Sequence, residues 1–284
     1  MKTGFIGLGH LGTAMARRLL SEGVDLLVWN RTGGKASALG IPLADSPARL
    51  ISEVGVLFMN LFDSSAVDAV LNGEGGLLRG DCRGKIVIDT TTNHFDSVAG
   101  FHEVLKQQGA SYLEAPVLGS VGPALQGALT ILVSGERQTY EKALPLLEKI
   151  GKTIFFLGEP SFATKMKLIN NLALGTFMAT IAEALVLGEK AGIDKAMVID
   201  ILSAGAGNST VLTAKKAGLL KEDFTTQFSS ALIYKDLHYL QDLARSLRSP
   251  LFTGSIAKEL FGMTFSGGLD QLDFSGVYRV LKGL

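Results

Sequence analysis

Residues 158–187 place the strongest constraint on how this chain can fold. The first half of this stretch is polar and carries Lys167 and Asn171, whereas the second half is apolar apart from Glu183. The apolar part is shorter than the roughly 20 residues that a membrane-spanning helix needs. We therefore predict a long helix that begins near Ser161 and is buried on every side, in a core or at a dimer interface. On such a helix Lys167 and Asn171 share one face.

The chain changes character on the two sides of this stretch. Before residue 158 short apolar runs alternate with helical patterns, which predicts an α/β fold with an N-terminal Rossmann-type doubly wound sheet. Strands are expected at residues 2–7, 25–30, 54–59, 85–89, 110–114, 128–133 and 153–156, and helices at 11–21, 65–71, 95–107 and 137–150.

After residue 158 only helical patterns follow. They cover residues 162–190, 194–203, 208–217, 230–247, 250–264 and 273–282, with Asp194, Asn208 and Asp273 at the expected N-caps. A chain of 284 residues has room for two cores. We predict a Rossmann-type domain at 1–160 and an all-α C-terminal domain at 161–284, which is joined to the first by the long helix.

Composition excludes several classes of function. The 27 basic and 27 acidic residues balance, which argues against nucleic acid or an anionic membrane as a partner. Cys82 is the single cysteine, and the four histidines have no zinc-site spacing, so no metal is expected. Because Met1 is followed directly by a strand pattern, we expect no signal peptide and a cytoplasmic location.

A glycine-rich turn follows the first predicted strand. Residues 7–12 read GLGHLG, the GxGxxG pattern, between a strand and a helix. The first glycine permits the tight turn, the second lets the backbone approach a pyrophosphate, and the third allows close packing of helix on strand. Free amides at the helix start then hold the phosphates. We predict that Gly7, Leu8, Gly9, His10, Leu11 and Gly12 bind a dinucleotide.

The end of the second predicted strand indicates which dinucleotide binds. An NAD site usually carries an acidic residue there, whereas this chain has Asn30, followed by Arg31, Thr32 and Lys35. These residues attract a 2′-phosphate instead of repelling it. The sequence therefore predicts NADP, with NADPH preferred over NADH.

Further cofactor contacts are expected where other strands end. Ligands of an open parallel sheet lie beyond the carboxyl ends of its strands. Asn60, Leu61 and Phe62 follow one strand, and Thr92 follows another. We predict that all of them contact the cofactor.

Four stretches together resemble the β-hydroxyacid dehydrogenase family, which includes 3-hydroxyisobutyrate dehydrogenase and the glyoxylate/succinic semialdehyde reductases. Residues 4–12 resemble its cofactor turn, and residues 114–120 (EAPVLGS) resemble its substrate signature, usually D-A-P-V-S-G-G. Residues 158–171 follow its G-x-x-G-x-G-x-x-x-K-x-x-x-N pattern, and residues 234–237 (YKDL) resemble its K-D-L segment. The order and spacing fit along the whole chain.

The resemblance implies roles for individual residues. Lys167 is implied as the catalytic lysine and general acid/base, with Asn171 as its partner, and Lys235 is implied to reach the cofactor. The implied substrate-binding residues are Leu118, Gly119, Ser120, Lys167, Asn171, Phe228 and Asp236. Leu118 departs from the family, which has a serine there to bind a substrate carboxylate, and Ser161 and Ala163 replace glycines.

The expected activity is therefore reduction of a small aldehyde or keto acid, of the succinic semialdehyde or glyoxylate class, by hydride transfer from NADPH. The domain at 1–160 is expected to bind NADP, and the helical domain at 161–284 to serve substrate binding and dimerisation. A homodimer or homotetramer is expected through the apolar long helix. Two alternatives stay open: a non-catalytic NADP-binding scaffold, and an imine reductase, since those enzymes share this architecture. A phosphorylated-sugar-acid dehydrogenase such as 6-phosphogluconate dehydrogenase is disfavoured, because those enzymes usually have a longer C-terminal domain than this chain provides.

Overall fold

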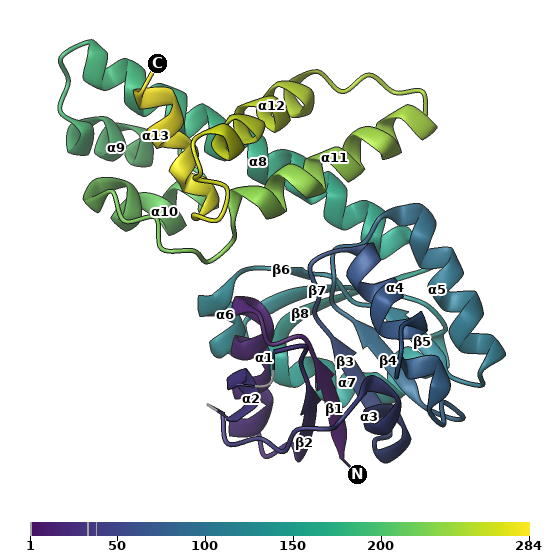
Figure 1. The fold of residues 1–284 in the computed structure, drawn as a ribbon. Helices are drawn as coiled ribbons and strands as arrows, with labels where there is room; N and C mark the ends of the chain where they lie inside the picture. The colour runs from purple at the N-terminus through teal and green to yellow at the C-terminus, as the bar shows by residue number, and fades with distance from the viewer. Residues whose placement is uncertain (1, 33, 38) are drawn as a thin grey trace. The chain divides into compact units, whose positions relative to one another are not determined.

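The computed structural model describes residues 2–32, 34–37 and 39–284, and it divides into two compact units (Figure 1). The first unit is Met1–Lys167 and the second is Leu168–Leu284. The division falls inside the long helix α8 (Phe162–Lys190), whereas the sequence places a domain boundary before that helix, after residue 160.

An eight-stranded sheet forms the middle of the first unit. Its strands are β1 (Thr3–Ile6), β2 (Leu26–Trp29), β3 (Val56–Met59), β4 (Ile86–Asp89), β5 (Ser111–Glu114), β6 (Val117–Leu118), β7 (Leu129–Ser134) and β8 (Gly151–Gly158). They are ordered β2-β1-β3-β4-β5-β7-β6, and β8 pairs with β7.

The strands pair in parallel from β2 to β5, and β8 also pairs in parallel with β7. The predicted doubly wound sheet is confirmed, but strand β7 runs antiparallel to β5 and β6 at the other end of the sheet. Parallel neighbours need a crossover connection of about a dozen residues or more, usually a helix that packs on the sheet. Between β5 and β7 the chain forms only β6 and the short helix α6 (Val121–Leu125), and it turns back instead.

Helices cover both faces of this sheet. They are α1 (His10–Ser21), α2 (Gly34–Ser37), α3 (Pro47–Glu53), α4 (Ser64–Asn72), α5 (Phe95–Gln107) and α7 (Arg137–Ile150), with a 3₁₀ turn η1 at Leu77–Arg79. Adjacent strand residues enter opposite cores: Phe5 packs with α1 and α7, whereas Ile6 packs with α3, α4 and α5. Two buried faces explain why these strands are almost wholly apolar.

The second unit is helical. After α8 come α9 (Lys195–Ala204), α10 (Thr210–Lys221), α11 (Ser230–Ser246), α12 (Phe252–Ser266), a 3₁₀ turn η2 (Phe274–Gly276) and α13 (Val277–Lys282). Asp194 and Asp273 cap α9 and η2 as predicted. The cap predicted at Asn208 is wrong, because Ser209 directly precedes the first helical residue and accepts from Leu212 N.

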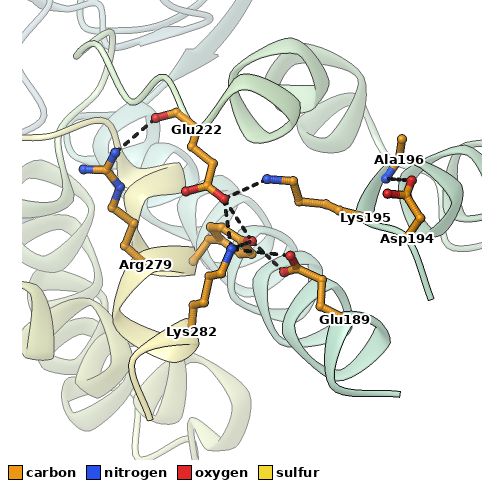
Figure 2. Close-up of polar contacts among 8 residues, drawn as sticks. Glu189, Asp194, Lys195, Ala196, Glu222, Arg279 and Lys282 are labelled. Atoms are coloured by element: carbon orange, nitrogen blue, oxygen red, sulfur yellow. Dashed lines mark hydrogen bonds and ion pairs between the residues drawn. The ribbon is translucent and has the colours of Figure 1, made fainter. Parts of the chain in front are cut away.

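A cluster of ion pairs holds the last helix to the rest of the second unit (Figure 2). Glu222, which follows α10, accepts from Lys195 Nζ at 2.8 Å and from Lys282 Nζ at 3.0 Å. Tyr278 of α13 donates its hydroxyl to Glu189 of α8 at 2.6 Å. The hydrogen bonds from Lys195, the largest cause, and from Lys282 lower the pKa of Glu222 from 4.5 to about 2.

One face of α8 is exposed in the single chain. Phe177 and Leu187 have 49% and 70% of their surface exposed, and Ile169 and Ala173 are exposed on the same face. The prediction that this helix is buried on every side is therefore wrong for one copy of the chain. By length and composition α8 is also the one helix of the described residues that could cross a membrane.

Candidate functional site

Two of the three glycines in the turn after β1 are required by the chain itself. Gly7 has φ of +96°, and a Cβ there would lie 2.1 Å from Asn60 O. A Cβ on Gly12 would lie 2.0 Å from Gly7 O. Both distances are far below ordinary contact, so neither position accepts a side chain without moving backbone.

Gly9 is different. A Cβ built on Gly9 meets no heavy atom of the described residues within 4 Å, and its φ of −70° suits any residue. Nothing in the described chain therefore requires glycine there. The open space lies at the start of α1, where backbone N–H groups and the positive end of the helix dipole favour an anion. This geometry fits a pyrophosphate that approaches the backbone at Gly9.

The other residues predicted in this turn divide into two groups. The Leu8 side chain is buried and Leu11 is half-buried against the core around α1, so these two offer the ligand only backbone. His10 is exposed. The N–H of Leu8 donates to Asn30 Oδ1 at 2.9 Å, which ties the phosphate turn to the end of β2.

Asn30 thus acts as a brace between two loops. Its Nδ2 donates to Thr32 O at 2.8 Å, so both ends of the amide are used within the chain. Arg31, Thr32 and Lys35 are exposed just beyond β2, with Gly33 outside the described residues. The positive charges predicted to hold a 2′-phosphate are therefore accessible to a ligand.

The strand ends form one edge of the sheet. Trp29, Ile6 and Met59 pair side by side, and Met59 pairs with Asp89, so the chain leaves four parallel strands at one level. Asn60, which follows β3, donates to Thr90 Oγ1 at 3.0 Å, and Leu61 N donates to Thr91 Oγ1 at 3.0 Å. Phe62 is half-exposed and Thr92 half-buried along the same two loops. The structure therefore brings the predicted cofactor residues of the first unit to a common edge.

A buried carboxylate that the sequence analysis missed fixes this edge. Asp89 ends β4 and accepts from Thr91 N, Asn93 Nδ2 and the Tyr112 hydroxyl at 2.7–2.9 Å. Burial raises the pKa of Asp89, and the hydrogen bonds oppose this rise. Burial also raises the pKa of Tyr112 well above its usual value, and the charge of Asp89 adds to this. The network holds the loop that contains Thr92 in one conformation.

The predicted substrate signature crosses the antiparallel end of the sheet. Leu118 is half-buried in β6 opposite Thr130, and Gly119 follows with φ of +119°. Ser120 is half-buried directly before α6. The structure therefore keeps an apolar side chain where the family pattern has a serine hydroxyl.

Lys167 and Asn171 both lie on α8, which continues without a break from Phe162 to Lys190. The lysine is only 7% exposed, and the asparagine is 0% exposed. Lysine side chains are seldom buried in proteins, and a buried ammonium group needs polar groups around it. Its neighbour Lys165 is half-buried and faces the rings of Phe95 and Phe162 instead.

Within the second unit Asn171 joins a buried polar group from α11. Its Nδ2 donates to Asp236 Oδ2 at 2.6 Å, and Lys235 Nζ lies 2.9 Å from Asp236 Oδ1. This assignment of the amide makes Asn171 Oδ1 the acceptor end of the side chain. Lys235 Nζ also lies 5.2 Å from the centre of the Tyr239 ring.

Phe228 is held by a residue that sequence analysis singled out only as a cap. Gln227 N and Phe228 N both donate to Asp273 Oδ2 at 3.2 Å, and Lys215 Nζ reaches the same oxygen at 2.8 Å. The Phe228 ring packs edge-to-face on Phe274. Asp273 therefore fixes the loop that carries the predicted substrate residue.

Within the described residues no group of three or more histidine, cysteine, aspartate or glutamate side chains is placed to hold a metal ion.

Comparison with known proteins identifies the family of this chain. Residues 2–158 match the NAD-binding domain of 6-phosphogluconate dehydrogenase, and residues 162–281 match the family described as NAD-binding of NADP-dependent 3-hydroxyisobutyrate dehydrogenase. The chain is 33% identical to glyoxylate/succinic semialdehyde reductase 1 of Arabidopsis thaliana over 99% of each protein. It is 35% identical to the chloroplastic reductase 2 of the same plant, over 98% of this chain and 79% of the relative.

Solved structures have the same fold. The 3-hydroxyisobutyrate dehydrogenase of Salmonella typhimurium is 25% identical, with a TM-score of 0.91 over 99% of each chain. Psf3 in complex with NADP⁺ and 2-OPP is 30% identical, with a TM-score of 0.90 over 98% of this chain and 99% of that one. The imine reductase of Streptomyces aurantiacus is 22% identical, with a TM-score of 0.68 over 99% of this chain and 100% of that one, a likeness of fold alone. The chain belongs to the β-hydroxyacid dehydrogenase family, and it is an oxidoreductase of that family that uses NADP as its cofactor.

Proposed function

We propose that this protein reduces a small aldehyde or keto acid, of the succinic semialdehyde or glyoxylate class, with Lys167 as the general acid. The observation that carries this proposal is the buried lysine on α8, four residues before an equally buried asparagine. An amine held in a fixed place away from bulk water suits proton transfer to a reacting oxygen. The two Arabidopsis relatives, which are named for these substrates, support the substrate class.

The bound cofactor supplies the hydride to the carbonyl carbon. Lys167, as an ammonium, donates a hydrogen bond to the carbonyl oxygen and releases its proton as that oxygen gains negative charge, which leaves a hydroxyl group on the product. In the reverse direction the neutral amine of Lys167 takes the proton from the hydroxyl group. Stabilising the developing alkoxide in this way is the larger part of the expected rate enhancement.

Asp236 fixes the orientation of the Asn171 amide for this step. Because Asp236 holds Asn171 Nδ2, the amide cannot turn over without leaving a buried carboxylate oxygen unpaired. Asn171 Oδ1 therefore remains the acceptor, which suits an ammonium group or a substrate hydroxyl. If the Asn171 amide could flip, its NH₂ group would at times take the place of Oδ1. It would then compete with Lys167 as a donor to the substrate oxygen.

We infer that the substrate is bulkier or less polar than glyoxylate. Leu118 has no hydroxyl to donate, so backbone amides near Gly119 and Ser120 are left to bind a carboxylate. A site that lacks a polar partner loses discrimination for the polar substrate. Leu118→Ser is expected to lower KM for glyoxylate more than KM for an aldehyde without a carboxylate.

The preference for NADPH is a further part of the proposal. Arg31, Thr32 and Lys35 are exposed beyond β2, and no acidic residue replaces Asn30 at the strand end. Arg31→Ala is expected to weaken NADPH binding while changing NADH binding little, because only NADPH carries the 2′-phosphate. Equal weakening of both would contradict this part.

We also propose that two copies of the chain pair through the exposed face of α8. Ile169, Ala173, Phe177 and Leu187 lie on one face of this helix and would leave an apolar stripe in water in a single copy. The double variant Phe177→Glu/Leu187→Glu is expected to be a monomer in sedimentation velocity. Leu247→Glu is the control, because Leu247 is also exposed and apolar but lies at the end of α11, and this variant should still pair. A wild-type monomer at all concentrations would refute the pairing.

The activity is tested by following NADPH oxidation with succinic semialdehyde, glyoxylate, less polar aldehydes and a cyclic imine. The proposal predicts turnover of a carbonyl substrate and a faster rate with NADPH than with NADH. Turnover of the imine alone would favour an imine reductase. Tight NADPH binding without any turnover would favour a non-catalytic scaffold.

A further inference from the structure

The first turn of α8 is anchored by groups from outside the helix. A helix leaves its first N–H groups without intrahelical partners, and here all of them are satisfied. Lys165 N makes the first intrahelical bond, to Ser161 O at 2.9 Å. The earlier donors are Ser161 N to Glu114 Oε1, Phe162 N to Glu159 O, Ala163 N to Ser134 Oγ and Thr164 N to Glu114 Oε2.

Glu114 performs a task that local residues usually perform. In a capping box the N-cap side chain accepts from the third helical N–H, and the side chain of that third residue accepts from the N-cap N–H. Here one carboxylate from β5 accepts from both, at Ser161 and Thr164. Its Oε2 also accepts from the Thr164 hydroxyl at 2.7 Å.

The side chain of Ser161 does not cap α8, and its conformation explains why. Its φ is +70°, in the left-handed region, and its hydroxyl donates to Phe95 O at 3.0 Å. A non-glycine residue in this region is strained and persists only where its surroundings hold it. The hydrogen bonds of Ser161 N to Glu114 and of Ser161 Oγ to Phe95 supply that hold.

The Glu114 carboxylate is 1% exposed and lies well inside the first unit. Burying such a group costs several kcal/mol unless donors surround it. It has three donors from α8 and its cap, and His102 Nε2 of α5 lies 3.3 Å from Oε1. The buried Glu114 carboxylate therefore binds the start of the helix that carries Lys167.

We propose that Glu114 is a positioning residue for Lys167, an inference that rests on the proposed role of that lysine. Thr164 precedes Lys167 by three residues, or about one helical turn, so fixing Thr164 fixes the backbone from which the lysine projects. The negative charge also offsets the positive end of the α8 dipole, which otherwise disfavours an ammonium in the second turn. Without this anchor the first turn frays, and the amine no longer stays in line with the reacting oxygen.

Glu114→Gln tests this with little change in shape. The amide keeps one acceptor but places a donor against the N–H groups of the helix start. Misplacement of a catalytic group by about 1 Å costs on the order of 100-fold, so we expect kcat to fall about 10- to 100-fold. The affinity for NADPH should change less than about twofold. Glu114 lies beside Asp89 in the sheet, but its side chain bonds to Ser161, Thr164 and His102 and to none of the predicted cofactor residues.

Hydrogen exchange of residues 160–168 gives a readout that does not depend on activity. Faster exchange there, with the peptides of β1–β4 unchanged, is expected from Glu114→Gln. Glu159→Gln is the matched control, because it removes one negative charge at the same helix start, from an exposed side chain, and keeps the backbone carbonyl that Phe162 N uses. Thr164→Val removes only the hydroxyl bond to Glu114 and serves where Glu114→Gln does not fold.

The outcomes separate this inference from the proposed function. Faster local exchange with a lower kcat and unchanged NADPH affinity supports the inference. Unchanged exchange overturns it, as does a kcat that stays the same in Glu114→Gln, or in Thr164→Val if that variant alone folds. If the wild-type protein shows no turnover, the proposed function fails, and exchange alone then decides whether Glu114 anchors α8.

Discussion

A comparison of Gly9→Ala with Gly12→Ala separates a glycine kept for the fold from a glycine kept for a ligand. The same methyl group is added three positions apart in one turn. At Gly12 the new Cβ would lie 2.0 Å from the carbonyl oxygen of Gly7, whereas at Gly9 it meets no heavy atom of the described chain within 4 Å. The two variants should therefore fail in different ways.

For Gly12→Ala the expected loss is in stability. Backbone at Gly7 or in α1 must shift by about 1 Å to relieve the contact, and such overpacking costs about 1–3 kcal/mol, occasionally more. Alanine gains about 1 kcal/mol over glycine within a helix, which offsets part of this. We expect a net destabilisation of about 1–2 kcal/mol, measured by urea unfolding of the protein without NADPH.

For Gly9→Ala the expected loss is in binding. Its φ and ψ of −70° and −171° suit alanine, so the free energy of unfolding should change by less than about 1 kcal/mol. The methyl group occupies the space that the pyrophosphate needs, and we expect the Kd for NADPH, measured by calorimetry, to rise at least about tenfold, or about 1.4 kcal/mol. Full NADPH affinity in Gly9→Ala, or full stability in Gly12→Ala, would refute the reasoning.

Three further predictions concern the second unit. Asp236→Asn removes the charge that faces Lys235 and frees the Asn171 amide, so we expect kcat to fall by about tenfold or more with the Kd for NADPH nearly unchanged, as steady-state kinetics and calorimetry will report. Asp273→Ala breaks a buried ion pair and removes the side-chain acceptor of three backbone N–H groups, and urea unfolding should show a loss of about 3–5 kcal/mol. The pKa of Glu222 is lowered to about 2, so its stabilising effect is complete above pH 4.5 and is lost as the pH falls toward 2. The difference in thermal midpoint between the wild type and Glu222→Gln should therefore shrink over that range, and a constant difference would contradict the assignment.

The features that the sequence predicted are those decided within a short segment. Helices α5 and α7 begin and end at the predicted residues, and the GxGxxG turn lies between a strand and a helix as expected. Hydrophobic periodicity, glycines and capping residues act within a few positions of one another, so the local sequence is enough to predict these elements. Even here the cap of α10 is Ser209 and not Asn208. Both residue types are good N-caps, and the choice depends on where the helix begins, which is at Thr210.

The features that the sequence did not predict depend on partners far along the chain. Glu114 reaches Ser161, 47 residues later, and Asp89 reaches Tyr112, 23 residues later. No spacing rule connects such residues, so their roles became visible only in the structure. The direction of β7 and the exposed face of α8 have the same origin, since strand pairing and helix burial are settled by tertiary packing.

The measurement that tests the central claim most directly is NADPH oxidation by Lys167→Ala beside Lys165→Ala. Both variants remove one lysine from the same helix, but Lys167 is buried and Lys165 faces two aromatic rings. The account predicts that Lys167→Ala abolishes turnover of the best carbonyl substrate while NADPH affinity stays nearly the same, and that Lys165→Ala keeps most of the activity. Substantial turnover by Lys167→Ala, or loss of NADPH binding together with activity, would contradict the role assigned to this lysine.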